Sequence, residues 1–147
     1  MAGNISLRGG GRGAGPANIA RRSDADGAMG TRLKSILQEL VGDDTRAVAL
    51  VGADGQVVEA VTKRGAGDLQ HVAADLVALL KVGAYCARKL EGGDLDHVTM
   101  TTDHLAVLAV ALGPTHYLAT VLDAGGNLAR ARMQIKRRRA EIAEEIA

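Results

Sequence analysis

Residues 69–90 read LQHVAADLVALLKVGAYCARKL, and their apolar side chains occur on nearly every side of the helix that they predict. One apolar stripe recurs at intervals of three and four residues and predicts the side that packs on a sheet: Leu69, Val72, Leu76, Leu79, Gly83, Cys86 and Leu90, widened by Ala73, Val77, Leu80, Ala84 and Ala87. The other side is apolar as well: Ala74, Ala78, Val82 and Tyr85. A helix that is apolar on nearly all sides is buried on nearly all sides, so we expect a second copy, another protein or both to cover it.

The segments before this helix predict a short helix and a β-hairpin. Thr31 is a candidate N-cap, and the apolar residues that follow it recur with helical periodicity. Two β-rich runs come next, at residues 47–51 and 57–61. The Asp54-Gly55 pair between them predicts the left-handed positions of a tight hairpin turn.

The segments from the long helix onward predict a meander and a last helix. Asp68 is the expected N-cap of the long helix. Three strands are predicted at residues 96–102, 105–112 and 116–122, and their short connections favour antiparallel pairing. Residues 127–146 then predict an amphipathic helix with one apolar side.

The element order αββαβββα predicts an α+β fold. We expect one five-stranded antiparallel sheet, with the central helix on one face and the two terminal helices on the other. This domain is expected to span residues 29–147. Residues 1–28 are rich in Gly, Ala and Arg without a periodic apolar pattern, so they predict a disordered tail.

Composition limits the class of protein. Aromatic residues make up 1% of the chain and Phe and Trp are absent, so the core is built from aliphatic side chains, each larger one contributing roughly 1.5–3 kcal/mol when buried. The formal net charge of +1 gives no global electrostatic reason to bind nucleic acid. The single cysteine, Cys86, falls in the apolar stripe and predicts a buried, inert thiol. No uninterrupted apolar run reaches the ~18 residues of a membrane span, and we expect a cytoplasmic protein without membrane insertion.

The sequence shows no catalytic constellation and predicts no cofactor, metal site or enzymatic activity. The histidines lack the spacing of a zinc site: His71, His97, His104 and His116. The Gly9–Gly15 run lacks the Gly-Lys-Ser/Thr of a phosphate-binding loop. Asp94 and Asp96 are too few for a calcium loop.

Taken together, the element order and several local motifs resemble the Roadblock/dynein light chain family. The motifs are Ala47-Val-Ala-Leu-Val51 followed by Asp54-Gly55, the helix that ends in Leu90, the strand at residues 98–101, and the Asn127-Leu-Ala-Arg-Ala-Arg132 entry to the last helix. The resemblance runs from about Thr31 to the last residue.

This resemblance implies a homodimer, or a heterodimer with a paralogue, in which the strand at residues 96–102 pairs with its counterpart and two central helices lie side by side. That strand has Val98 and Met100 and no inward lysine or proline of the kind that usually protects an exposed edge. Members of the family are platforms for small Ras-like GTPases, and in some bacterial cases they stimulate hydrolysis. The implied GTPase-facing surface is the central helix pair, with these candidate residues: Ala74, Ala78, Lys81, Val82 and Tyr85. Helical phase alone does not separate dimer contacts from partner contacts.

Basic residues leave two further alternatives. Arg64 and Arg88 are candidates for an arginine that reaches the γ-phosphate of a bound GTPase, although neither lies in a supporting motif. The run Lys136-Arg-Arg-Arg139 is followed by acidic residues, and Arg137 is spaced to pair with Glu141 on a solvated helix face.

Three functions therefore compete. The leading hypothesis is a non-enzymatic dimeric adaptor or regulator of a small Ras-like GTPase. A purely structural self-association module is the second. The third is nucleic-acid binding through the basic tail and residues 136–139, which the mixed charges and the missing stacking aromatics weaken.

Overall fold

The computed structural model describes residues 24–63, 65 and 67–146. Residues up to Thr31 and residues from Arg32 onward form separate units. Among the described residues, the first unit contains only the beginning of a helix, and the second contains the sheet and the other helices. The elements are α2 (Asp24–Glu39), β1 (Thr45–Gly52), β2 (Val57–Thr62), α3 (Leu69–Lys89), β3 (His97–Thr101), β4 (Leu105–Ala111), β5 (His116–Asp123) and α4 (Leu128–Ile146).

The start of α2 differs from the prediction. The helix begins at Asp24, well before the predicted N-cap Thr31. The apolar periodicity begins only at Leu33, so no sequence pattern marked the earlier turns. The rest of the predicted tail, residues 1–23, lies outside the described residues.

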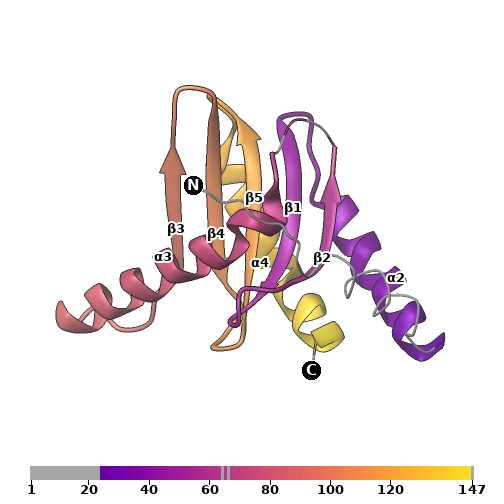
Figure 1. The fold of residues 1–147 in the computed structure, drawn as a ribbon, viewed down its shortest axis with the longest axis horizontal. Coiled ribbons are helices and arrows are strands. Elements are labelled where there is room, and N and C mark those ends of the chain that lie inside the picture. Colours follow the sequence, from indigo (N-terminus) through magenta and orange to yellow (C-terminus); the bar gives the residue numbers. More distant parts are fainter. Residues whose placement is uncertain (1–23, 64, 66, 147) are drawn as a thin grey trace. The chain divides into compact units, whose positions relative to one another are not determined.

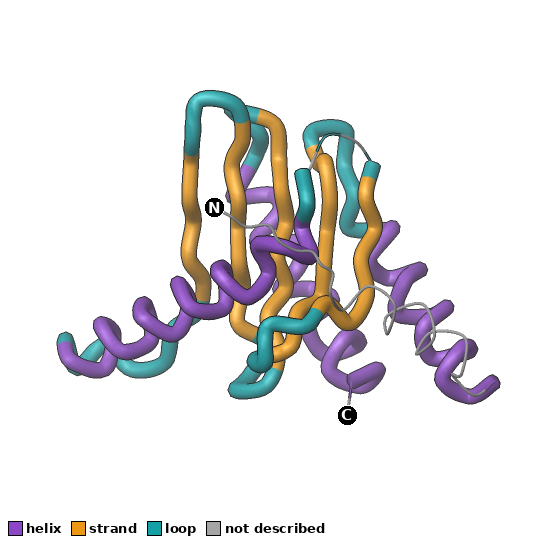
Figure 2. Tube along the Cα trace, viewed as in Figure 1, coloured by secondary structure: helices purple, strands orange, loops and turns teal. Residues whose placement is uncertain are grey.

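The five strands form one antiparallel sheet in the order β2-β1-β5-β4-β3. This confirms the predicted element order and sheet. Within the second unit, α3 crosses one face of the sheet, while α4 and the α2 residues from Arg32 onward cover the other (Figure 1 and Figure 2). β3 is an edge strand, and its only partner among the described residues is β4.

Two apolar clusters show why β1 is central. Alternate side chains of β1 point to opposite faces, as in any strand. Val48 and Leu50 pack in the cluster with α2 and α4, which includes Ile135 and Ile142 of α4. The other face has Ala47, Ala49 and Val51 in the cluster with α3. The alanines leave room for α3 to lie close to the sheet.

The β1–β2 turn needs glycine at its last position. Gly55 has a φ of 87°, and its N–H donates a hydrogen bond to the Gly52 carbonyl at 2.9 Å. A Cβ at Gly55 would lie 3.0 Å from the Cα of Ala74 in α3. The prediction of left-handed backbone at both Asp54 and Gly55 is wrong for Asp54, because Glu91 is the one non-glycine residue with positive φ in the described part of the chain.

Candidate functional site

The start of α3 is fixed by Asp68, as predicted. Its carboxylate accepts a hydrogen bond from the His71 backbone N–H at 3.1 Å and lies 2.7 Å from the His71 ring Nδ1. These hydrogen bonds, the side-chain one first, lower the pKa of the Asp68 carboxyl below its ordinary value. The cap orients the first turn so that a line of buried residues meets the sheet: Leu69, Ala73, Val77 and Leu80.

The predicted sheet-facing stripe is partly wrong. Val72 and Leu79 are each 43% exposed, Leu90 is 81% exposed, and Cys86 is exposed rather than buried. Two apolar lines overlap on this helix, and periodicity alone could not choose between them. The line through Ala73 and Leu80 faces the sheet, so the line through Leu79 is turned to its flank.

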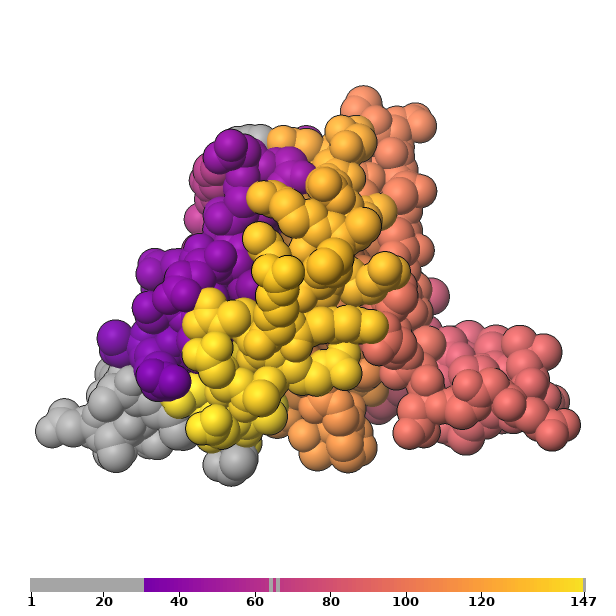
Figure 3. Space-filling view, turned by 180° about the vertical axis from the view of Figure 1, so that it is seen from behind, coloured from indigo at the N-terminus to yellow at the C-terminus, as the bar shows by residue number. Residues whose placement is uncertain are grey.

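The last turns of α3 have no sheet beneath them. In Figure 1 the helix continues past β3, and the view from behind in Figure 3 shows the same projection. The exposure of Cys86 and Leu90 follows from this geometry, because the sheet ends before the helix does.

The predicted partner surface on α3 lies in solvent. Val82 is 59% exposed and Tyr85 is 55% exposed. The Lys89 ammonium lies 5.3 Å from the centroid of the Tyr85 ring, within the range of a cation–π contact. The remaining members of this surface are exposed as well: Ala74, Ala78 and Lys81. We call Ala74, Ala78, Val82 and Tyr85 the outer side of α3.

The open edge of the sheet lies against another side of α3. Val98 and Met100 of β3 pair with Ala109 and Val107 of β4 and share their face, and Met100 is 40% exposed. A shallow apolar hollow joins this edge to the helix, lined by Leu76, Leu79, Leu80, Val98, Met100, Val107 and Ala109. We call Val72, Leu79 and Cys86 the edge side of α3.

The edge side and the outer side point in different directions. At about 100° per residue, Ala78 leaves the helix about 100° from Leu79, and Ala74 and Tyr85 leave it still farther away. The helix residues predicted as the interface therefore lie on the outer side or beside it, and the side that adjoins the open strand is a second surface made of other residues. Sequence reasoning missed the edge side because its residues were assigned to the core.

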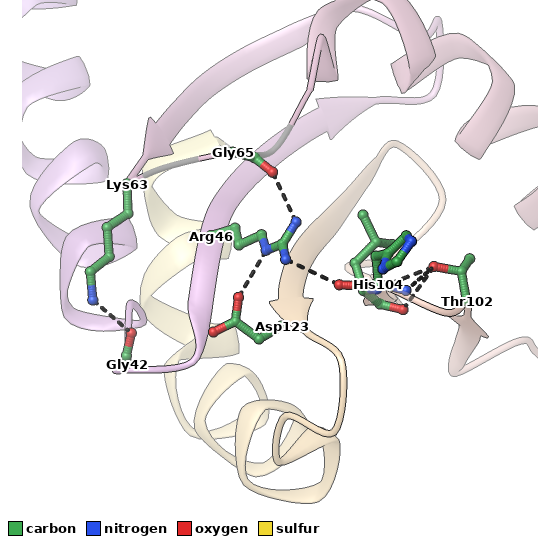
Figure 4. A network of polar contacts seen from close by, with 8 residues as sticks. Gly42, Arg46, Lys63, Gly65, Thr102, His104 and Asp123 are labelled. Atoms are coloured by element: carbon green, nitrogen blue, oxygen red, sulfur yellow. Dashed lines mark hydrogen bonds and ion pairs between the residues drawn. The ribbon is translucent and has the colours of Figure 1, made fainter.

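Arg46 of β1 joins three separate segments (Figure 4). Its Nε donates to Asp123 Oδ1 at 2.8 Å, and its two terminal nitrogens donate to the Gly65 and His104 carbonyls at 3.1 Å each. Gly65 precedes α3, and His104 lies in the β3–β4 turn. Arg46 thus ties the approach to α3 and the turn after the edge strand to β1.

The candidate chemical groups do not gather into one site. In the described residues, no group of three His, Cys, Asp or Glu side chains lies close enough to hold a metal ion. His71 contacts Asp68, His97 contacts Asp96 at 2.7 Å, and His116 Nδ1 lies 2.9 Å from the Thr115 hydroxyl. The hydrogen bond with His97, followed by the contact with Lys136, lowers the pKa of the Asp96 carboxyl.

The basic candidates are placed as follows. Arg88 is exposed in the last turn of α3, and Arg64 lies outside the described residues. In α4 it is Arg138, not Arg137, that pairs with Glu141, at 2.6 Å. Arg138, one residue after Arg137, points toward both Glu141 and Glu39 of α2.

α3 is also long and apolar enough to cross a membrane when judged by length and mean hydropathy alone. The same test is passed by core helices of soluble proteins. The sequence contains no uninterrupted apolar run of membrane length, because polar residues such as Asp75 and Lys81 interrupt α3. The mean hydropathy of α3 averages over these residues and is therefore still high.

Comparison with solved structures gives the fold. The chain is similar to a Roadblock/LC7 domain from Streptomyces avermitilis, with a TM-score of 0.69 and 18% identity over 77% of this chain and 96% of that one. It is also similar to the gliding protein MglB from Thermus thermophilus, with a TM-score of 0.72 and 16% identity over 80% and 90% of the two chains. Myxococcus xanthus MglB matches with a TM-score of 0.69 and 16% identity over 78% and 94%.

No family model matches the sequence, and a search of curated proteins finds no match. The likeness is thus carried by the arrangement of the elements rather than by side chains. The antiparallel five-stranded sheet, the central helix α3 on one face and the terminal helices on the other correspond to those structures over most of their length. The chain has a Roadblock-like domain, with the Roadblock/LC7 fold.

Proposed function

We propose that this chain is a non-enzymatic, self-associating adaptor that binds a small Ras-like GTPase and regulates its cycle. The observation that carries the proposal is the amount of apolar surface that α3 leaves in solvent on two sides while it also packs on the sheet. The Roadblock-like fold supports the same class of function. The proposal includes a cytoplasmic location and assigns no reaction to the chain itself.

Self-association is supported by the open edge. β3 presents unpaired backbone N–H and C=O groups along one side, and such edges pair readily with another strand. Pairing β3 with its counterpart from a second copy, or from a paralogue, would bring the two α3 helices together at their edge sides. Leu79 and Met100 would then be buried, as expected of an isologous interface. A tetrameric arrangement is described for one MglB structure.

GTPase binding is supported by the outer side. Once the edge side is occupied by a second copy, Ala74, Ala78 and Tyr85 remain free at about 100–140° from Leu79 around the helix, and Val82, at about 60° from Leu79, borders both sides. Its small alanines allow close approach of another backbone, and Tyr85 and Val82 supply the larger apolar contacts typical of interface centres. The proposal therefore assigns the outer side, with Lys81 beside it, to the GTPase.

The test uses Ala78→Arg, which adds a long charged side chain at the centre of the outer side. Each small Ras-like GTPase of the source genome is purified, loaded with GDP or with a non-hydrolysable GTP analogue, and titrated against the full chain by biolayer interferometry. The variant should keep the oligomeric state of the wild type and lose most of the GTPase binding.

Two results bear on the alternatives. Equal GTPase affinity of Ala78→Arg and wild type would show that the outer side is not the binding surface. If no GTPase binds the wild type in either nucleotide state, the chain is a structural self-association module only. Lys34→Arg serves as the control, because Lys34 is an exposed residue of α2 and the change keeps its charge.

A further inference from the structure

The cations of α4 fall into two groups with different partners. Arg138 is held by Glu141 and Glu39 at 2.6 Å each, and these hydrogen bonds, Glu141 first, raise its pKa. Arg130 lies 3.2 Å from Asp44. Each of these two arginines has at least one carboxylate of its own, so their charges are matched inside the unit.

The second group lies on the side of α4 that faces β3. Arg132, Lys136 and Arg139 follow the spacing i, i+4, i+7, which places them along one side of the helix over about 10 Å. Lys136 and Arg139 share the carboxylate of Asp96, which lies 3.3 Å from Lys136 and 3.6 Å from Arg139. The Arg132 guanidinium has the His97 ring at 3.5 Å.

Hydrogen-bond donors in this group remain unused. The Nε and Nη2 of Arg139 are shielded from solvent, and neither has a hydrogen-bond partner in the described residues. Because both nitrogens are shielded, a partner that approaches from solvent meets the exposed parts of Lys136 and Arg139, whose side chains are 46% and 40% exposed, rather than these two donors. Asp96 shows that a carboxylate fits beside them, although its distance from Arg139 is too long for a good hydrogen bond. The group thus holds three cations for one anion.

We propose that this side of α4, Arg132, Lys136 and Arg139, is a docking surface for an acidic polypeptide segment. The surface lies on the opposite face of the sheet from α3, so it is separate from the outer side and the edge side; in Figure 3 this face is turned toward the viewer, with α4 in yellow. Its size suits two or three carboxylates that succeed one another along one helix or strand.

Charge and composition favour a polypeptide over the other anionic partners. A nucleic acid is held by an extended basic field and, when single-stranded, by stacking aromatics. The whole chain has a net charge of +1 and 1% aromatic residues. A membrane surface needs apolar residues beside the cations, and Met133 is the one large apolar residue that is exposed among the described residues of α4.

The test uses a labelled probe with defined chemistry. A fluorescein-labelled helical peptide of about 15 residues, with glutamates at i, i+4 and i+7 in an alanine-rich host, is titrated with the full chain and followed by fluorescence anisotropy. The same host with glutamine in place of glutamate is the blank. Wild type should bind the glutamate peptide and should bind it more weakly as salt is added.

The variant is the double substitution Lys136→Gln with Arg139→Gln, at side chains that are 46% and 40% exposed. It should weaken binding by about tenfold or more, a loss of about 1.4 kcal/mol. The control, Lys34→Gln with Arg137→Gln, removes the same charge from exposed positions of α2 and α4 and should change binding less than twofold.

Four results would overturn the proposal. Absence of binding at low salt, or equal loss in the variant and its control, would show that no localised surface exists. Tighter binding of duplex DNA or of phosphatidylserine vesicles through the same two residues would assign the surface to another class of partner. Loss of self-association in the variant, measured by sedimentation, would assign it to a second copy of this chain.

Discussion

Leu79 and Leu80 are neighbours in the sequence and have opposite roles in the structure. Leu80 is 2% exposed and lies on the side of α3 that faces the sheet, whereas Leu79 is 43% exposed on the edge side. Both residues are leucines in an apolar run, so composition does not distinguish them. Their difference is set by which of two overlapping apolar lines faces β1, and it is testable residue by residue.

Leu80→Ala is expected to lower the free energy of unfolding by roughly 2–4 kcal/mol, because it leaves a cavity in the core. Leu79→Ala, at low protein concentration where the chain is not associated, is expected to cost less than about 1 kcal/mol, since half-exposed side chains lose little burial. Urea unfolding followed by circular dichroism measures both. Equal losses of unfolding free energy in the two variants would mean that Leu80 does not pack against the sheet.

Asp68 acts at the first turn of the same helix. Asp68→Ala removes the acceptor of the His71 N–H and should lower Tm by on the order of a few degrees. Asp68→Asn keeps an acceptor at the N-cap and should lower Tm less. The pKa of the Asp68 carboxyl is lowered in the folded chain, so its charge stabilises the fold above the ordinary carboxyl pKa.

The pH dependence of this effect has a definite sign. As the pH falls through the lowered pKa of Asp68, the carboxylate is protonated and its contribution is lost. The Tm difference between wild type and Asp68→Asn should therefore shrink in acid and be constant near neutral pH. A difference that grows toward low pH would contradict the assignment. Thermal melts of wild type and Asp68→Asn, from neutral pH down through the acid range where carboxyl groups titrate, measure this Tm difference.

At the scale of the elements, β1 organises both sides of the sheet and, through Arg46, the two loops that border the candidate surfaces. The Arg46 guanidinium reaches the segment before α3 and the turn after β3 with hydrogen bonds of 3.1 Å. The position of the start of α3 relative to the edge strand therefore depends on this residue.

Arg46→Ala is expected to cost roughly 1–3 kcal/mol, since Asp123 and two backbone carbonyls lose the guanidinium as a donor. Arg46→Lys should recover only part of this, because an ammonium cannot reach three acceptors with the geometry of a guanidinium. The control is Lys63→Ala, whose Nζ lies 3.5 Å from the Gly42 carbonyl, and it should cost less than about 0.5 kcal/mol. Urea unfolding of the three variants measures these costs, and equal values for Arg46→Ala and Lys63→Ala would remove Arg46 from this role.

The elements were largely predictable from sequence, and the orientation of α3 was not. Alternating and helical patterns mark β1, β2, α3 and α4, and Asp68 and the turn at Gly55 mark two boundaries. The sheet-facing line of α3 was ambiguous because small residues such as Ala73 are as able to face a sheet as Val72. Arg46 gave no signal, since two of its partners are backbone atoms distant in sequence.

At the scale of the whole molecule, the candidate site consists of two surfaces of α3, the outer side and the edge side, and only the edge side adjoins β3. The residues of the outer side were predicted because they are apolar or small at helical spacing. Their separation from the edge side required the structure, since only the packed helix shows which side adjoins β3. The proposed function depends above all on the edge side and β3 forming a self-association interface together.

Sedimentation velocity of the full chain, wild type beside Met100→Lys, tests this interface. Met100 is 40% exposed on the open edge, and a lysine there opposes strand pairing. The wild type should sediment as a dimer, at twice the 15.2 kDa of one chain, and the variant as a folded monomer. The control Met133→Lys, at a 52% exposed position of α4, should remain dimeric. A wild type that is monomeric at micromolar concentration, or a Met100→Lys variant as dimeric as wild type, would show that the open edge is not the interface.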